Sequence, residues 1–159
     1  MSKKYKLTEK YIIVDGVKLF QIQALVSFGT VSAGDFGGYI QKEENLSQSG
    51  NAWVFDNALV SGNARVYGNA WVYGNAQVYG RNSIFWASEV GTENGTLTVS
   101  SGKNGLVVTR GCFTGTKEEF LAKSAKVHDE KTQCEYRLLI EVAESRIKHH
   151  KAPEPTTAD

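Results

Sequence analysis

The side chains best suited to chemistry lie in the stretch VVTRGCFTGT, residues 107–116. Arg110 offers a forked guanidinium group that can hold a phosphate or carboxylate through two hydrogen bonds. The start of a predicted helix follows, and its free N–H groups favour anions. The spacing therefore predicts an anion-binding site, with a surface ion pair as the alternative role for Arg110. The neighbours expected to share this site are Thr109, Gly111, Thr114 and Thr116.

Two aromatic side chains upstream could complete the site by stacking a planar ligand. Tyr79 and Trp86 stand near the end of a repeated region of the sequence, and an aromatic ring offers a face on which a nucleobase can stack. Together with Arg110 they predict a site for a small anionic or nucleotide-like ligand. We expect this site between subunits, near the C-terminal part of the chain.

Catalytic and metal-binding constellations are weak in this sequence. The histidines stand at positions 128, 149 and 150, so the repeats hold no histidine base of the kind that acyl transfer uses. His128, Asp129 and Glu130 could hold a metal, but a polar loop between helices accounts better for them. Cys112 is expected to be a small buried residue rather than a nucleophile. We predict no catalytic residue, no metal site and no cofactor.

A repeat of six residues must position the candidate site. Residues 49–90 read SGNAWV, FDNALV, SGNARV, YGNAWV, YGNAQV, YGRNSI and FWASEV, and an aliphatic residue ends every hexad. An amphipathic helix needs a period near 3.6 residues, and a meander needs about 8 to 12 residues for each strand and turn. The pattern therefore predicts short parallel strands stacked in a solenoid, with Gly-Asn at its corners.

These hexads resemble the hexapeptide-repeat family, in which a small residue stands four places after an aliphatic one. The resemblance implies a left-handed, triangular parallel β-helix with three hexads in each coil. The expected fold is mainly β: this short β-helix, an N-terminal β-hairpin cap, and a C-terminal element of β-structure and two helices. The chain departs from the family pattern by placing aromatic residues directly after the aliphatic ones, as at Tyr67.

The chain divides into four predicted segments. Residues 1–48 hold a hairpin with an Asp15-Gly16 turn, lying over an irregular first coil. Residues 49–99 form the β-helix. Residues 100–150 form a β-hairpin and two helices, the first capped at Thr116 and the second running from about 132 to 148 with an apolar stripe. Residues 151–159 are polar and contain two prolines, which predicts a disordered tail.

Stacking with three hexads in each coil places four aromatic residues on one outward face: Trp53, Phe55, Trp71 and Tyr73. A monomer rarely leaves such a patch in water. Hexapeptide-repeat proteins are usually trimers, so the resemblance implies that this face packs in a homotrimer. The alternative is an aromatic platform for a planar ligand.

Charge and hydropathy exclude several classes of protein. The 18 basic and 17 acidic residues are interspersed and leave a net charge of +1, so we expect neither general nucleic-acid binding nor membrane binding. The first residues lack the apolar core of a signal peptide, and no apolar run approaches the roughly 20 residues that span a bilayer. We expect a soluble, cytoplasmic protein.

Four segments carry a second resemblance: AGDFGGYI, ENLSQSGNAWV, EVGTENGTLTV and LVVTRGCFTGT. Over roughly residues 15–145, the chain resembles small proteins of bacteriophages and prophages. It implies a phage context, and hence the host bacterial cytoplasm. The predicted function is a non-catalytic trimer that captures a small ligand and sequesters a nucleotide-derived signal of host immunity. The alternatives are a scaffold or protein-binding β-helix, and an acyltransferase of the hexapeptide-repeat class.

Overall fold

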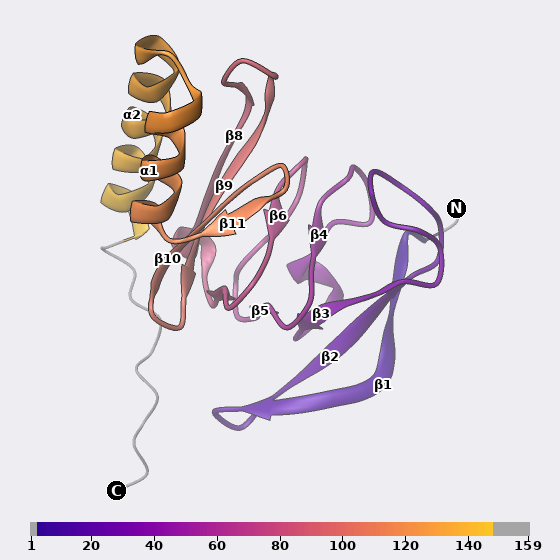
Figure 1. Ribbon diagram of the computed structural model, residues 1–159. Helices are drawn as coiled ribbons and strands as arrows, with labels where there is room; N and C mark the ends of the chain where they lie inside the picture. The colour runs from indigo at the N-terminus through magenta and orange to yellow at the C-terminus, as the bar shows by residue number, and fades with distance from the viewer. Residues whose placement is uncertain (1–2, 148–159) are drawn as a thin grey trace, which may run out of the picture.

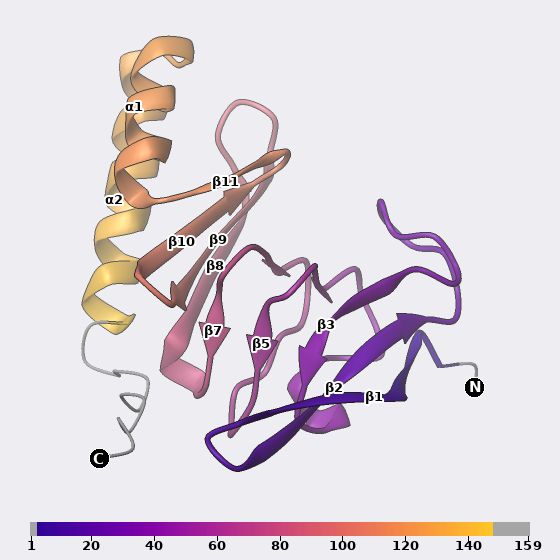
Figure 2. The ribbon, with the colours of Figure 1, turned by 60° about the horizontal axis from the view of Figure 1, so that its bottom comes forward.

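A stack of short parallel strands forms the centre of the computed structural model, which describes residues 3–147 (Figures 1 and 2). One column of the stack contains β3 (Phe36–Ile40), β5 (Leu59–Val60) and β7 (Gln77–Val78), and a second contains β4 (Trp53–Val54) and β6 (Trp71–Val72). A parallel bridge from Leu46 to Val66 marks a third side. Val54 pairs with Val72 and Val60 with Val78. These partners are three hexads apart, so the predicted solenoid repeat is confirmed.

The corners of the coils explain the Gly-Asn pairs. The residue that precedes each asparagine has a positive φ in five successive hexads: Gly50, Asp56, Gly62, Gly68 and Gly74. At Gly62 any Cβ would collide with the carbonyl oxygen of Tyr79 in the next coil. Asp56 occurs at this position because aspartate tolerates the left-handed conformation better than most residues. The repeat therefore encodes its turns as directly as its strands.

The solenoid ends earlier than the hexad alignment predicts. A short 3-10 helix, η2 (Arg81–Ser83), ends the last coil, and β8 (Ile84–Val90) pairs antiparallel with β9 (Gly95–Gly102). The prediction that the β-helix extends to residue 99 is therefore wrong, because β8 and β9 belong to an antiparallel sheet. The last hexad has Trp86 at the corner position that needs a positive φ, and a bulky residue adopts that conformation poorly.

The N-terminal hairpin extends one face of the solenoid. β1 (Tyr5–Val14) and β2 (Val17–Ala24) meet at the predicted Asp15-Gly16 turn, where both residues have a positive φ. β2 then pairs antiparallel with β3, in the same sheet as β5 and β7 (Figure 2). The sequence predicts that the hairpin lies over the first coil. In the structure β2 pairs with the edge of β3 instead, because the free N–H and C=O groups of β3 need partners.

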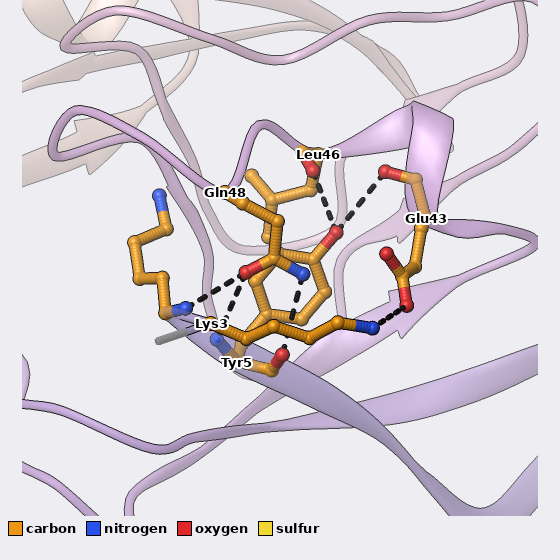
Figure 3. Close-up of polar contacts among 6 residues, drawn as sticks. Lys3, Tyr5, Glu43, Leu46 and Gln48 are labelled. Atoms are coloured by element: carbon orange, nitrogen blue, oxygen red, sulfur yellow. Dashed lines mark hydrogen bonds and ion pairs between the residues drawn. The ribbon is translucent and has the colours of Figure 1, made fainter. Parts of the chain in front are cut away.

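The N-terminal end of the solenoid is closed by Tyr5 (Figure 3). Its side chain is fully buried, and its hydroxyl donates to the carbonyl oxygens of Leu46 at 2.6 Å and Glu43 at 3.1 Å, beside the 3-10 helix η1 (Glu43–Asn45). Burial raises the pKa of Tyr5. The side-chain amide of Gln48 accepts from the Tyr5 N–H at 3.2 Å and donates to its carbonyl at 3.3 Å. Lys3 adds an ion pair with Glu43 at 2.8 Å.

An antiparallel sheet closes the other end of the solenoid. Its order is β11-β10-β9-β8, with β10 (Gly105–Arg110) and β11 (Phe113–Gly115) following β9. One face meets the last coil: the Thr98 hydroxyl accepts from the Trp71 N–H at 3.2 Å, and the Lys103 N–H donates to the Asn75 carbonyl at 3.1 Å. The sheet thus supplies partners to a coil that has no successor.

Two helices cover the opposite face of that sheet (Figure 1). They are α1 (Lys117–Val127) and α2 (Glu130–Ile147), and the predicted capping box of Thr116 at the start of α1 is confirmed. The predicted apolar stripe of α2 packs on the sheet through Tyr136, Ile140, Ala143 and Ile147. Within residues 3–147, neither helix has the length and apolarity of a membrane-spanning segment. The predicted disordered tail, 151–159, lies outside the described residues.

We predict that Tyr5→Phe lowers the free energy of unfolding by about 1 to 3 kcal/mol, because it leaves the buried Leu46 carbonyl without its donor. Urea denaturation would measure the change. Tyr11→Phe is the matched control, since Tyr11 lies on the same strand with 45% of its surface exposed. Equal stability of the two variants would contradict a closing role for the Tyr5 hydroxyl.

Candidate functional site

Three of the residues predicted to bind a ligand, Trp86, Thr109 and Arg110, lie on two opposite faces of the C-terminal sheet. Trp86 pairs with Thr98, and Thr98 with Thr109, so these three side chains share the face that meets the solenoid. Arg110 pairs with Leu97, which packs against the helices. The structure therefore separates Arg110 from Trp86, because successive residues of a strand point to opposite sides.

Arg110 packs between its strand and α2. Its Nε donates to the Tyr136 hydroxyl at 3.1 Å, and its guanidinium lies 4.0 Å from the Glu93 carboxylate. The side chain is 16% exposed, and its guanidinium fills the space where a side chain at Gly95 would lie. These contacts match the ion-pair alternative for Arg110, and they hold α2 against the sheet.

The threonines around Arg110 serve the local structure. Thr116 accepts from the Glu119 N–H at 3.0 Å, and the Glu119 carboxylate accepts from the Thr116 N–H at 2.8 Å. This capping box occupies N–H groups that an anion would need. Thr109 is buried, with its hydroxyl 3.5 Å from that of Thr114. Gly111 has a positive φ at the turn into β11.

The weaker constellation at His128 also has a structural explanation. His128 Nδ1 lies 2.8 Å from the Ser124 hydroxyl, and the Asp129 carboxylate accepts from the Thr132 N–H at 2.9 Å. The hydrogen bonds from Thr132 lower the pKa of Asp129. No group of three metal-ligating side chains occurs within residues 3–147. Cys112 is exposed, not buried as expected, because it lies in the turn between β10 and β11.

The aromatic face is partly covered by the chain itself. Trp53 is only 1% exposed, because Tyr5 and Phe28 pack edge-on against its ring. The prediction that Trp53 lies on an outward interface is therefore wrong. Phe55 and Tyr73 remain half-buried, with their rings stacked at a centroid distance of 3.9 Å and an interplanar angle of 6°. Trp71 flanks them, and a trimer contact through these three residues stays a prediction.

A different group of residues forms a pocket of about 490 Å³ at the junction of the solenoid, η2, β8 and α2. This arginine pocket joins residues that lie far apart in the sequence. Its lining consists of Arg65, Tyr67, Arg81, Asn82, Ile84, Phe85, Trp86 and Arg146.

Buried neighbours determine which side chains reach the arginine pocket. Val66 is 1% exposed and points into the solenoid, so Arg65 and Tyr67 on either side of it point outward. On β8, Trp86 follows the buried Ile84 by two residues, so both side chains point to the same side of the strand. Arg146 precedes Ile147, which packs in the core of the C-terminal part. The pocket is thus assembled from the solenoid, η2, β8 and α2.

The arginine pocket concentrates positive charge beside aromatic rings. Its lining includes three arginines and no acidic residue, and none of the ion pairs within residues 3–147 involves these arginines. The rings of Tyr67 and Trp86 meet edge to face with centroids 4.6 Å apart, and Tyr67 is 55% exposed. The pocket can therefore hold an anionic group and pack a planar ring at the same time.

Of the predicted ligand-binding residues, Trp86 alone lines this pocket. The Tyr79 hydroxyl donates to the Gln77 side chain at 3.0 Å, outside the pocket. The three arginines and Tyr67 are not among the residues that the sequence predicts for the site. The repeat pattern itself marks Arg65 as unusual. Among the five hexads from 49 to 78, Arg65 is the single charged residue at the outward position before the valine. The other four hexads have tryptophan, leucine or glutamine there.

Comparisons with known proteins concern the repeats. Residues 58–74 and 64–80 match the family model of the YdcK beta solenoid repeat. The uncharacterized acetyltransferase YdcK of Escherichia coli strain K12 is 40% identical over 62 residues, which cover 34% of this chain and 19% of the relative. The chain thus spans about a fifth of the length of that curated relative. In its repeats, this protein is similar to a family of β-solenoid proteins.

Proposed function

We propose that this protein binds a small anionic ligand with a planar ring, of the nucleotide class, in the arginine pocket. One observation supports this proposal most strongly: three arginines and two contacting aromatic side chains line one hollow whose described lining contains no carboxylate. Its volume of about 490 Å³ falls within the range of roughly 300 to 1,000 Å³ that is common for small-molecule sites.

In this proposal the pocket divides the ligand between two kinds of contact. Arg65 and Arg81 bind a phosphate, because a guanidinium matches phosphate geometry with paired hydrogen bonds. The exposed ring of Tyr67 packs against the base, and Trp86 holds that ring from the side. Arg146 adds positive charge from the last turn of α2. All of these groups bind the ligand, and none is assigned a step in a reaction.

The proposal includes two finer features of the architecture. The first is that the coil is left-handed, in keeping with the six-residue spacing of the repeats. A homotrimer is proposed to form through Phe55, Trp71 and Tyr73, whose half-buried rings adjoin on one face. The phage context and the capture of a host immune signal rest on the resemblance given above and stay predictions.

Arg65→Gln and Arg81→Gln are each expected to weaken binding of adenosine 5′-monophosphate about tenfold, through loss of charge-assisted hydrogen bonds. Isothermal titration calorimetry at low salt would measure the affinities, which should also fall as salt is added. Arg137→Gln is the matched control, because Arg137 is exposed on α2 and lies outside the pocket lining. Equal affinities in all three variants, or no binding of the nucleotide by the wild type, would contradict the proposal.

The variant Arg110→Gln tests whether the ligand binds in the arginine pocket or at the site that the sequence predicts around Arg110. We expect the substitution to lower the free energy of unfolding by about 1 to 2 kcal/mol, because it removes the hydrogen bond to Tyr136. Affinity for the same nucleotide should not change. A tenfold weaker affinity without a loss of stability would move the binding site to Arg110.

Acyl transfer from a coenzyme A thioester is the second candidate. It is favoured by the similarity to a relative that is named an acetyltransferase. The arginine pocket would then bind the nucleotide portion of coenzyme A. Against it, the hexads contain no histidine that could deprotonate an acceptor.

The two candidates differ in the fate of the ligand. Binding without catalysis predicts that a nucleotide is recovered unaltered after the protein is denatured. Acyl transfer predicts that free thiol accumulates when the protein is incubated with acetyl coenzyme A and a pool of amines and alcohols. A thiol assay would detect it, and release that exceeds the protein concentration and is lost in Arg65→Gln would favour the enzyme.

A further inference from the structure

A second hollow borders the arginine pocket, because the two share lining residues. A cavity of about 310 Å³ adjoins it, and Arg65 and Arg81 line both spaces. The remaining residues of this lysine hollow are Lys42, Glu44, Gly62, Asn63 and Ala64. Because the same two arginines border both spaces, a ligand held by them can extend from one into the other.

Charge distinguishes the lysine hollow from the other space beside these arginines. Its lining contains three cationic side chains and one carboxylate, that of Glu44. A further hollow of about 480 Å³ also contacts Arg65 and Arg81, but it includes both Glu43 and Glu44 and lacks Lys42. Positive charge therefore extends from the arginine pocket toward Lys42.

The side chains of the lysine hollow are available to a ligand. Lys42 is exposed just before η1, and none of the ion pairs in the described chain involves its ammonium group. The Gly62 N–H already donates to the Gln41 side chain at 2.8 Å. The donors that this hollow adds for a ligand are therefore Lys42 and the amide of the exposed Asn63.

We propose that the ligand carries a second phosphate group and that this group binds in the lysine hollow. The inference rests on the proposed function, since it requires a first phosphate at Arg65 and Arg81. The two arginines then lie between the phosphates, and Lys42 contacts the second one. The second phosphate can belong to a diphosphate or to a phosphodiester that joins another nucleoside.

Affinities of three probes for the full chain test this inference: adenosine 5′-monophosphate, adenosine 5′-diphosphate, and the linear dinucleotide pApA. At least one probe with two phosphates should bind about tenfold more tightly than the monophosphate. A gain for the diphosphate indicates adjacent phosphates, and a gain for pApA alone indicates the phosphodiester.

Lys42→Gln should remove this gain and leave the affinity for the monophosphate unchanged. Lys10→Gln is the control, because Lys10 is exposed on β1 and lines none of these hollows. Equal affinities of the three probes for the wild type, or a gain that survives Lys42→Gln, would overturn the inference while the proposed function stands. Failure of all three probes to bind would overturn the proposed function and this inference with it.

Discussion

The free edges of a short parallel stack are the constraint on which this structure depends. Strands of two residues make few hydrogen bonds, and both ends of the stack present N–H and C=O groups that must find partners. At one end β2 pairs with β3, and at the other Thr98 and Lys103 bond to the last coil. The repeats are thus held between two unlike caps.

Lys4 meets the same need for hydrogen-bond partners, and its pKa is altered as a result. Its side chain is 4% exposed, and its ammonium group donates to the Ala52 carbonyl at 2.8 Å and to the Ser49 and Gly50 carbonyls at 3.5 and 3.4 Å. Burial lowers its pKa to about 8. A cation is thus retained in a place that disfavours charge, because it is a donor for several carbonyls at a coil corner.

Local signals account for the parts of the fold that the sequence predicts. The Gly-Asn-Ala corners, the Asp15-Gly16 turn and the Thr116 capping box each depend on a few adjacent residues, so their patterns can be read directly. The path of β8 depends on a competition between another coil and pairing with β9, which the hexad spacing does not report. The burial of Trp53 has the same origin, since the residues that cover it lie in a distant segment.

The arginine pocket exists because β8 leaves the stack. A further coil would lie over Arg65 and Tyr67, whereas the antiparallel sheet diverges and leaves them facing Trp86 and the end of α2. The matched repeats, residues 58–80, include Arg65 and Tyr67, but Arg81, Trp86 and Arg146 lie beyond them. The match to the family model therefore covers two of the five residues that we propose to bind the ligand. The other three lie in η2, β8 and α2, so a solenoid with the same coils and different elements after them would present a different pocket.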